Sequence, residues 1–153
     1  MTRILVVEDS PTARALIVAL LESDPEFEVV GQAASGREAV EMVGRLRPDL
    51  VTMDVVMPDI DGLEATRRIM AIAPTPILIF TAHGDSPELN VAFEALKAGA
   101  LDVLPKPGRM GSGDVAGWGS GLVDAVKRLA RVRPRVTDAP PAQERASQEG
   151  EGR

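Results

Sequence analysis

Short apolar runs alternate with amphipathic segments along most of this 153-residue chain, and this alternation restricts the fold more than any other feature. Five runs have the length and the aliphatic content of strands, and each is followed by apolar residues at helical spacing. The expected strands are residues 4–7, 27–33, 50–53, 77–80 and 101–104. Strands joined by helices pair in parallel and are covered on both faces. We therefore expect an α/β, doubly wound (βα)5 fold with a five-stranded parallel sheet in the order 2-1-3-4-5.

Capping residues predict where the expected helices begin and end. Ser10-Pro11, Ser35-Gly36, Asp61-Gly62 and Ser86-Pro87 predict helix starts, because a short polar side chain accepts a hydrogen bond from a free N–H of the first turn. Gly99 predicts the end of the fourth helix. The inward face of that helix is expected to carry Leu89, Ala92, Phe93 and Leu96. The second expected strand is the least apolar, so we expect it near an edge of the sheet.

The last part of the chain has a different character. A glycine-rich loop is expected over residues 108–121, followed by an amphipathic helix that begins at Leu122. The exposed side of this helix is expected to be basic, through Lys127, Arg128 and Arg131. Trp118, inside the loop, is interpreted either as a docking anchor or as a cover for the apolar face of the helix. We expect one domain over residues 1–132 and a disordered tail or linker remnant over 133–153, since that segment has too few apolar residues to offset the entropy of ordering it.

Composition excludes several classes of function. The net charge of −6 argues against nucleic acid as a partner, which usually requires a basic surface. The absence of cysteine excludes disulfides, thiolate metal sites and cysteine nucleophiles, and is compatible with a reducing, cytoplasmic location. No apolar run approaches the roughly 20 residues of a membrane span, so no membrane insertion is expected.

Polar residues suited to chemistry stand at the ends of four of the five expected strands. Glu8 and Asp9 follow the first strand, Asp54 the third, Thr81 the fourth and Lys106 the fifth. In a doubly wound sheet, ligands bind beyond the carboxyl ends of the strands, where the strand order reverses. The order 2-1-3-4-5 places the first and third strands side by side, so these residues are expected on one rim.

The residue types on this rim suit phosphoryl transfer. Crowded carboxylates repel one another unless a cation joins them, and an all-oxygen site without His or Cys suits Mg²⁺. A carboxylate can attack phosphorus and carry the group as an acyl phosphate. The charge on the transferred group would be met by the metal and the Lys106 ammonium, and the Thr81 hydroxyl can donate a hydrogen bond. Asp54 is therefore the predicted phosphoacceptor.

The sequence is similar to the receiver domains of two-component response regulators over about residues 2–132. That resemblance implies that Asp54 takes a phosphoryl group from a histidine kinase. The matching motifs are Glu8-Asp9, Asp54 with Met57-Pro58 and Asp61-Gly62, Thr81-Ala82, Gly99-Ala100 and Lys106-Pro107.

The resemblance also implies roles for individual residues at the predicted site. Asp9, Asp54 and the backbone carbonyl of Val56 would bind Mg²⁺, with Glu8 acting through water. Thr81 and Lys106 would sense the phosphoryl oxygens. The Lys106-Pro107 peptide bond would be cis, a state that proline makes accessible.

Three positions are expected to tune the switch. The resemblance implies that Val56 and His83 lie near the attacking water and set the rate of self-dephosphorylation, which we expect to be slow to moderate because Val56 has no group to orient water. His83 is alternatively interpreted as an ordinary exposed loop histidine without a catalytic role. Many receivers carry Tyr or Phe three residues before the lysine, as a switch coupled to the threonine. Here that position is Val103, which cannot swing in the same way, so the coupling from Thr81 is expected to run through backbone and packing.

Within the family, residues 101–107 and the long loop most resemble the receiver of the chemotaxis protein-glutamate methylesterase. Full-length members carry a C-terminal esterase domain with a Ser-His-Asp triad. This chain has no Gly-x-Ser-x-Gly elbow after a strand, so no esterase activity is expected from it. It is interpreted either as a stand-alone receiver or as a regulatory fragment of such an enzyme.

As a signalling switch, the phosphorylated domain would change the face made by its fourth helix, fifth strand and fifth helix, and that face would bind a downstream partner or a missing output domain.

Rival functions fit less well. A flavodoxin-like binder would need flavin-stacking aromatics, and only 3% of residues are aromatic. A haloacid-dehalogenase-like phosphatase would need Asp-x-Asp after the first strand, where this chain has Glu8-Asp9-Ser10.

Overall fold

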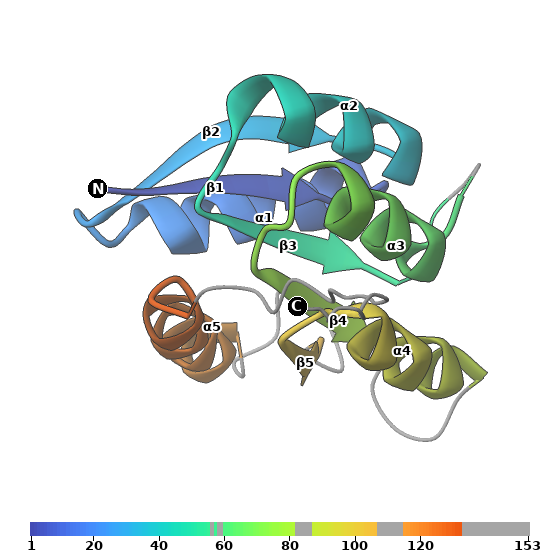
Figure 1. Cartoon of the computed structure of the whole chain (residues 1–153). Coiled ribbons are helices and arrows are strands. Elements are labelled where there is room, and N and C mark those ends of the chain that lie inside the picture. Colours follow the sequence, from blue (N-terminus) through green and yellow to red (C-terminus); the bar gives the residue numbers. More distant parts are fainter. Residues whose placement is uncertain (56, 58–59, 82–86, 107–114, 133–153) are drawn as a thin grey trace.

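The computed structural model describes residues 1–55, 57, 60–81, 87–106 and 115–132 (Figure 1). The predictions for the 133–153 tail, for residues 108–114 of the loop and for the capping role of Ser86 lie outside these ranges.

The strands form one parallel sheet in the order β2-β1-β3-β4-β5, as predicted. The strand bounds are β1 Thr2–Val7, β2 Phe27–Ala33, β3 Leu50–Asp54, β4 Ile77–Thr81 and β5 Asp102–Pro105. The less apolar strand, β2, lies at an edge as expected. The order reverses between β1 and β3, which are neighbours although β2 separates them in the chain.

Five helices connect and cover the strands in the described part of the chain. Their bounds are α1 Pro11–Glu22, α2 Gly36–Leu46, α3 Gly62–Ile72, α4 Pro87–Ala98 and α5 Val115–Leu129. Buried residues from α2, α3 and α4 form one core layer, and buried residues from α1 and α5 form the other. Figure 1 shows α2 and α3 on the opposite side of the sheet from α1. The doubly wound fold is thereby confirmed.

The strand β1 ends in a continuous apolar run that is buried on both faces. In β1, Leu5 and Val7 face the α2–α4 layer, whereas Ile4 and Val6 face the α1–α5 layer, and all four have 0% exposure. A strand with one wet face would instead alternate apolar and polar residues. The continuous apolar run thus fits the position of β1 inside the sheet, between β2 and β3.

Side chains cap three helices where the sequence predicts. Ser10 Oγ accepts a hydrogen bond from Ala13 N at 3.3 Å, and Ser35 Oγ accepts one from Glu38 N at 3.2 Å. Asp61 Oδ1 accepts from Glu64 N at 2.9 Å. After α4 the chain turns through the positive φ of Gly99, +127°, which confirms the predicted stop.

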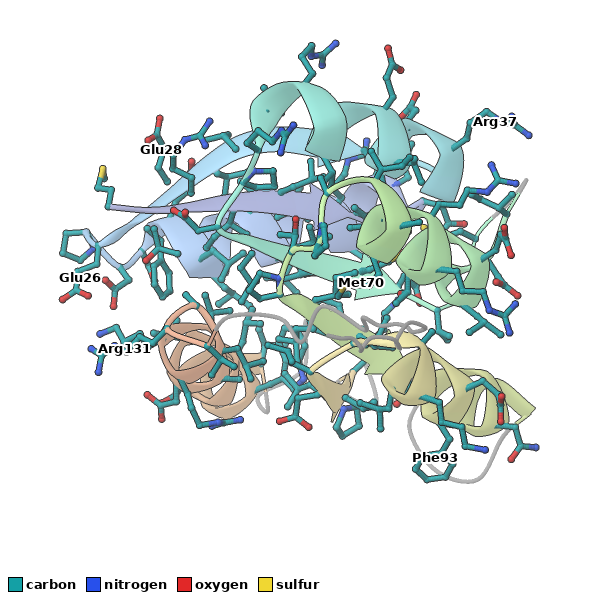
Figure 2. The ribbon with its side chains drawn as sticks, viewed as in Figure 1. Glu26, Glu28, Arg37, Met70, Phe93 and Arg131 are labelled. Atoms are coloured by element: carbon teal, nitrogen blue, oxygen red, sulfur yellow. The ribbon has the colours of Figure 1, made fainter. Side chains whose placement is uncertain are left out.

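The prediction for Phe93 is wrong: its side chain is 51% exposed. The inward stripe of α4 runs through Ala95 and Leu96. Phe93 precedes Ala95 by two residues, which is about 200° around a helix of 3.6 residues per turn. Phe93 therefore projects outward from α4 (Figure 2).

The helix α5 begins at Val115, so the prediction of a loop reaching residue 121 is wrong for residues 115–121. Glycines in this segment oppose a helix by about 1 kcal/mol each. The helix nevertheless forms, and Gly119 lies close against α1: a Cβ there would lie 2.7 Å from Leu20 Cδ2, so a larger residue would require the Leu20 side chain to shift. Trp118 packs its ring against Phe80, with ring centroids 5.5 Å apart, as the cover interpretation predicted.

Candidate functional site

The carboxyl ends of β1, β3, β4 and β5 meet on one rim of the sheet. Strand pairing places Val7 beside Met53, the residue before Asp54. Asp54 pairs with Phe80, and Thr81 pairs with Pro105, the residue before Lys106. The structure therefore brings the strand-end residues together as the sequence predicts.

Three carboxylates gather at the β1 and β3 ends of this rim. Glu8, Asp9 and Asp54 each offer an oxygen, and these oxygens lie within 4.8 Å of one another. Glu8 is 1% exposed and Asp54 is 7% exposed, whereas Asp9 is exposed. Burial, and next the negative charge of Asp54, raise the pKa of the Glu8 carboxyl to about 7. The cluster is therefore short of positive charge.

Lys106 supplies part of the missing charge. Its ammonium Nζ lies 2.9 Å from Asp54 Oδ2 and 3.0 Å from Glu8 Oε1. Burial alone would lower the pKa of Lys106, but the hydrogen bond and the charge of Asp54, reinforced by Glu8, raise it. One ammonium facing three carboxylates leaves a net negative charge when all are ionised.

The donor set fits a hard divalent cation. Glu8 Oε1 is buried, and no hydrogen bond with good geometry reaches it within the described residues, although it is ion-paired with Lys106. Carboxylate oxygens from two adjacent strand ends are the ligands that Mg²⁺ prefers. The residues present therefore fit the predicted metal.

Local structure fixes the Glu8 carboxylate in place. Its Oε2 accepts a hydrogen bond from Ser10 N at 3.3 Å, and its backbone carbonyl accepts one from Arg14 Nη1 at 2.7 Å. Its own N–H donates to the carbonyl of Ala33 in β2 at 2.9 Å. Arg14 is a site residue that was not predicted. The available signal was a basic residue in the first turn of the helix that follows Glu8-Asp9.

Gly62 allows α3 to start directly against the strand end that carries Asp54. A Cβ there would lie 2.8 Å from the carbonyl oxygen of Asp54 and 2.9 Å from Val55 Cα. The Gly62 N–H donates to the carbonyl of Val55 at 2.9 Å. The Asp-Gly pair therefore has two functions, since Asp61 caps the helix and the glycine permits the close approach.

The remaining predicted residues occupy the other half of the rim. Thr81 is 2% exposed, and its carbonyl accepts a hydrogen bond from Lys106 N at 2.8 Å. Val103 pairs with Ile79 and packs, partly buried, against the layer of α2–α4. The predicted roles of the Val56 carbonyl and side chain, of His83 and of the cis Lys106-Pro107 bond concern residues outside the described ranges.

Comparisons with known proteins agree with this geometry. Residues 4–112 match the response regulator receiver domain. A protein-glutamate methylesterase/protein-glutamine glutaminase of Anaeromyxobacter dehalogenans is 51% identical over 149 residues, which are 93% of this chain and 43% of the relative. The corresponding protein of Syntrophus aciditrophicus is 48% identical, again covering 43% of the relative. This chain thus spans less than half the length of these curated relatives.

A solved structure gives the same result. The response regulator domain of Thermotoga maritima CheB matches with a TM-score of 0.79 and 34% identity, covering 88% of this chain and 99% of that one. The predicted resemblance to the methylesterase receiver is confirmed. In the described part of the chain, none of the helices has the length and apolar character of a membrane span. The chain belongs to the family of response regulator receiver domains.

Proposed function

We propose that this domain accepts a phosphoryl group on Asp54 in a Mg²⁺-dependent reaction and thereby changes its binding to a partner. The observation that carries the proposal is the contact of Asp54 Oδ2 with the Lys106 ammonium, at 2.9 Å, inside a cluster of three carboxylates. A phosphoryl-transfer site requires this combination of nucleophile and positive charge.

The proposed step is an in-line displacement at phosphorus. A carboxylate oxygen of Asp54 attacks, and the new O–P bond forms as the bond from phosphorus to the imidazole nitrogen of a kinase histidine breaks. The electron pair of the broken bond stays on that nitrogen, and Asp54 becomes an acyl phosphate. Lys106 lies close enough to Asp54 to meet the added negative charge, and the Thr81 hydroxyl would donate to another phosphoryl oxygen.

The acid cluster would hold the metal. Asp9, Asp54 and the Val56 carbonyl are the proposed ligands, with Glu8 acting through water. Bound Mg²⁺ would supply the positive charge that neutralises the transferred group. Glu8, Ser10 and Arg14 would keep the ligand set in place through the hydrogen bonds of the β1–α1 turn.

The proposed partners are a histidine kinase of chemotaxis type, in the cytoplasm, and a downstream protein or output domain. The output face would include α4, β5 and α5, where Phe93 projects from the surface with 51% exposure (Figure 2). We propose no esterase activity for this domain itself. Because both relatives are named protein-glutamate methylesterases and align over 93% of this chain, the specific second candidate is the regulatory part of such an enzyme.

Intact mass after incubation with Mg²⁺ and acetyl phosphate tests the proposal. The wild-type protein is expected to gain one phosphoryl group, and Asp54→Asn is expected to gain none. Asp124→Asn, the same change at an exposed position on α5, is the matched control and is expected to behave as wild type. A mass gain that survives Asp54→Asn would refute Asp54 as the acceptor.

A further inference from the structure

A single peptide group joins the candidate site to α5. The N–H of Lys106 donates to the carbonyl of Thr81 at 2.8 Å. The carbonyl of the same peptide, on Pro105, accepts a hydrogen bond from the indole N–H of Trp118 at 2.6 Å. Because the N–H and C=O of a trans or cis peptide unit are parts of one rigid plane, a tilt of this plane changes both hydrogen bonds together.

The ring of Trp118 also contacts β4, the strand that ends at Thr81. It packs against Phe80 at a centroid distance of 5.5 Å with the planes at 59°, a tilted aromatic contact. Phe80 immediately precedes Thr81 and is fully buried. Trp118 thus contacts the residues that directly precede Thr81 and Lys106, the two residues proposed to meet the phosphoryl oxygens.

Trp118 is firmly connected to the rest of α5. It lies in the first turn of the helix, one turn before Leu122, which is fully buried in the α1–α5 core layer. Gly119, the next residue, lies against Leu20 of α1. A displacement of the indole would therefore act on the start of α5, which Leu122 and Gly119 hold against the core and against α1.

Val103 faces the other side of the sheet. Its side chain packs with the α2–α4 layer, whereas Trp118 packs with the α1–α5 layer. The position that carries an aromatic residue in many receivers is therefore aliphatic here, and the aromatic contact with the sensing strands comes from α5 instead.

We propose that Trp118 is a positioning residue that couples phosphorylation of Asp54 to the start of α5. This inference rests on the proposed function. When Thr81 and Lys106 shift toward the phosphoryl group, the Pro105–Lys106 peptide and Phe80 move with them, and Trp118 transmits the shift to residues 115–122. The alternative, that Trp118 only covers the core, predicts no response to phosphorylation.

Tryptophan fluorescence tests the coupling directly, because Trp118 is the only tryptophan in the chain. The wild-type protein is treated with Mg²⁺ and acetyl phosphate while intact mass is followed in parallel. A change in emission that rises with the phosphorylated fraction is expected, and Asp54→Asn is expected to show none. A mass gain without a change in emission would overturn the inference while leaving the proposed function intact. No mass gain would refute the proposed function and this inference with it.

Amide hydrogen exchange of residues 115–122 then tests whether phosphorylation changes the start of α5 through Trp118. Each variant is compared with its own unphosphorylated form, which removes any difference in basal stability. Trp118→Phe keeps a ring but loses the N–H donor, and it is expected to lose most of the exchange difference seen in wild type. Arg128→Gln is the matched control, because it breaks a different contact between α5 and β5, the 3.0 Å ion pair with Asp102, at the far end of the strand.

The two variants must differ for the inference to stand. Arg128→Gln is expected to keep the wild-type exchange difference. An unchanged difference in Trp118→Phe would overturn the role of the indole. An equal loss in both variants would show that general loosening of α5, rather than Trp118, abolishes the response, and would overturn the inference as well.

Discussion

At the ends of β1 and β3, the rim of the sheet consists of charged side chains. At the ends of β4 and β5, a backbone peptide and two aromatic rings connect the rim to α5. We call the first part, with Glu8, Asp9 and Asp54, the acid side, and the second, with the Pro105–Lys106 peptide and Trp118, the α5 side. The acid side has excess negative charge, which suits it to binding a cation and a phosphoryl group. The α5 side contributes one charge, the Lys106 ammonium, which contacts Asp54 and Glu8. Its other contacts are the peptide hydrogen bonds and the aromatic pair, which suit it to transmitting a displacement. In the proposed function, the metal and the phosphoryl group would bind on the acid side, and the displacement would pass to α5 from the α5 side.

Replacing Gly62 by alanine tests the acid side and has the largest expected effect. The added Cβ would lie 2.8 Å from the carbonyl oxygen of Asp54 and 2.9 Å from Val55 Cα, and backbone atoms cannot rotate away. We expect the free energy of unfolding, measured by urea denaturation, to fall by about 3 kcal/mol, as for an overpacked core. Slower phosphorylation by acetyl phosphate is also expected, because the strand end that carries Asp54 has to move.

The same change elsewhere provides the comparison. In Gly119→Ala, on the α5 side, the Cβ would lie 2.7 Å from Leu20 Cδ2, the end of a flexible side chain that can turn aside. Gly44→Ala in α2 meets no atom within 4 Å and is expected to stabilise the protein by about 1 kcal/mol through helix propensity. If Gly62→Ala and Gly119→Ala lowered the free energy of unfolding equally, the two sides would not differ in how strongly they resist an added methyl group.

The sequence predicts the acid side better than the α5 side for a physical reason. Strand bounds and strand-end residue types depend on local patterns: a continuous apolar run, then a polar residue, then a capping residue such as Ser10 or Asp61. The strand order follows from the rules that connect strands in a doubly wound sheet. These patterns determine where Glu8, Asp54 and Lys106 lie before any packing is known. Consequently the fold class, the strand order and the meeting of the strand-end residues could all be predicted.

The start of α5 depends on contacts between residues far apart in the chain. Glycines near Trp118 indicate a loop by propensity, whereas the observed helix packs Gly119 against Leu20 and Trp118 against Phe80. The outward position of Phe93 has a similar cause, since α4 turns the stripe through Ala95 inward. No local signal in the sequence contains either contact.

The pH dependence of Mg²⁺ binding tests the charge imbalance of the acid side. Burial raises the pKa of Glu8 from its usual 4.5 to about 7, so the metal-free folded protein holds a proton there that the unfolded chain releases. The contribution of Glu8 to stability is therefore full below pH 4.5 and is lost as the pH rises through about 7. A cation that favours the ionised form should bind roughly tenfold more tightly at pH 8 than at pH 6.

Isothermal titration with Mg²⁺ at both pH values measures this effect. Glu8→Gln is expected to lose the pH dependence, because the titrating carboxyl is gone. Glu94→Gln, an exposed glutamate of α4 paired with Lys97, is the matched control and is expected to keep it. If Glu8→Gln retained the tenfold change, another group would be titrating, and Glu8 would not define the acid side.

The smallest expected effect lies beneath the rim, in the core that both sides share. Thr52 of β3 is fully buried beside Val6 and Leu78, and its hydroxyl has no hydrogen-bond partner within the described residues. Thr66 of α3 is equally buried, but its hydroxyl donates to the carbonyl of Gly62 at 2.7 Å. Valine has nearly the same shape as threonine, so the two Thr→Val changes differ mainly in the hydrogen bond removed.

Thr52→Val is expected to stabilise the protein by about 1 kcal/mol, because an unpaired buried hydroxyl costs free energy that valine does not. Thr66→Val is expected to destabilise it by about 1 kcal/mol through the lost hydrogen bond. Urea denaturation of both variants measures whether the free energy of unfolding rises or falls in each. A loss for Thr52→Val would mean that its hydroxyl is paired in solution, so that the polar character of the acid side extends two residues down β3. A higher free energy of unfolding for Thr52→Val would show that the polar contacts of the acid side stop at the rim. The layer between Asp54 and α5 would then be held by apolar packing alone, as transmission by packing requires.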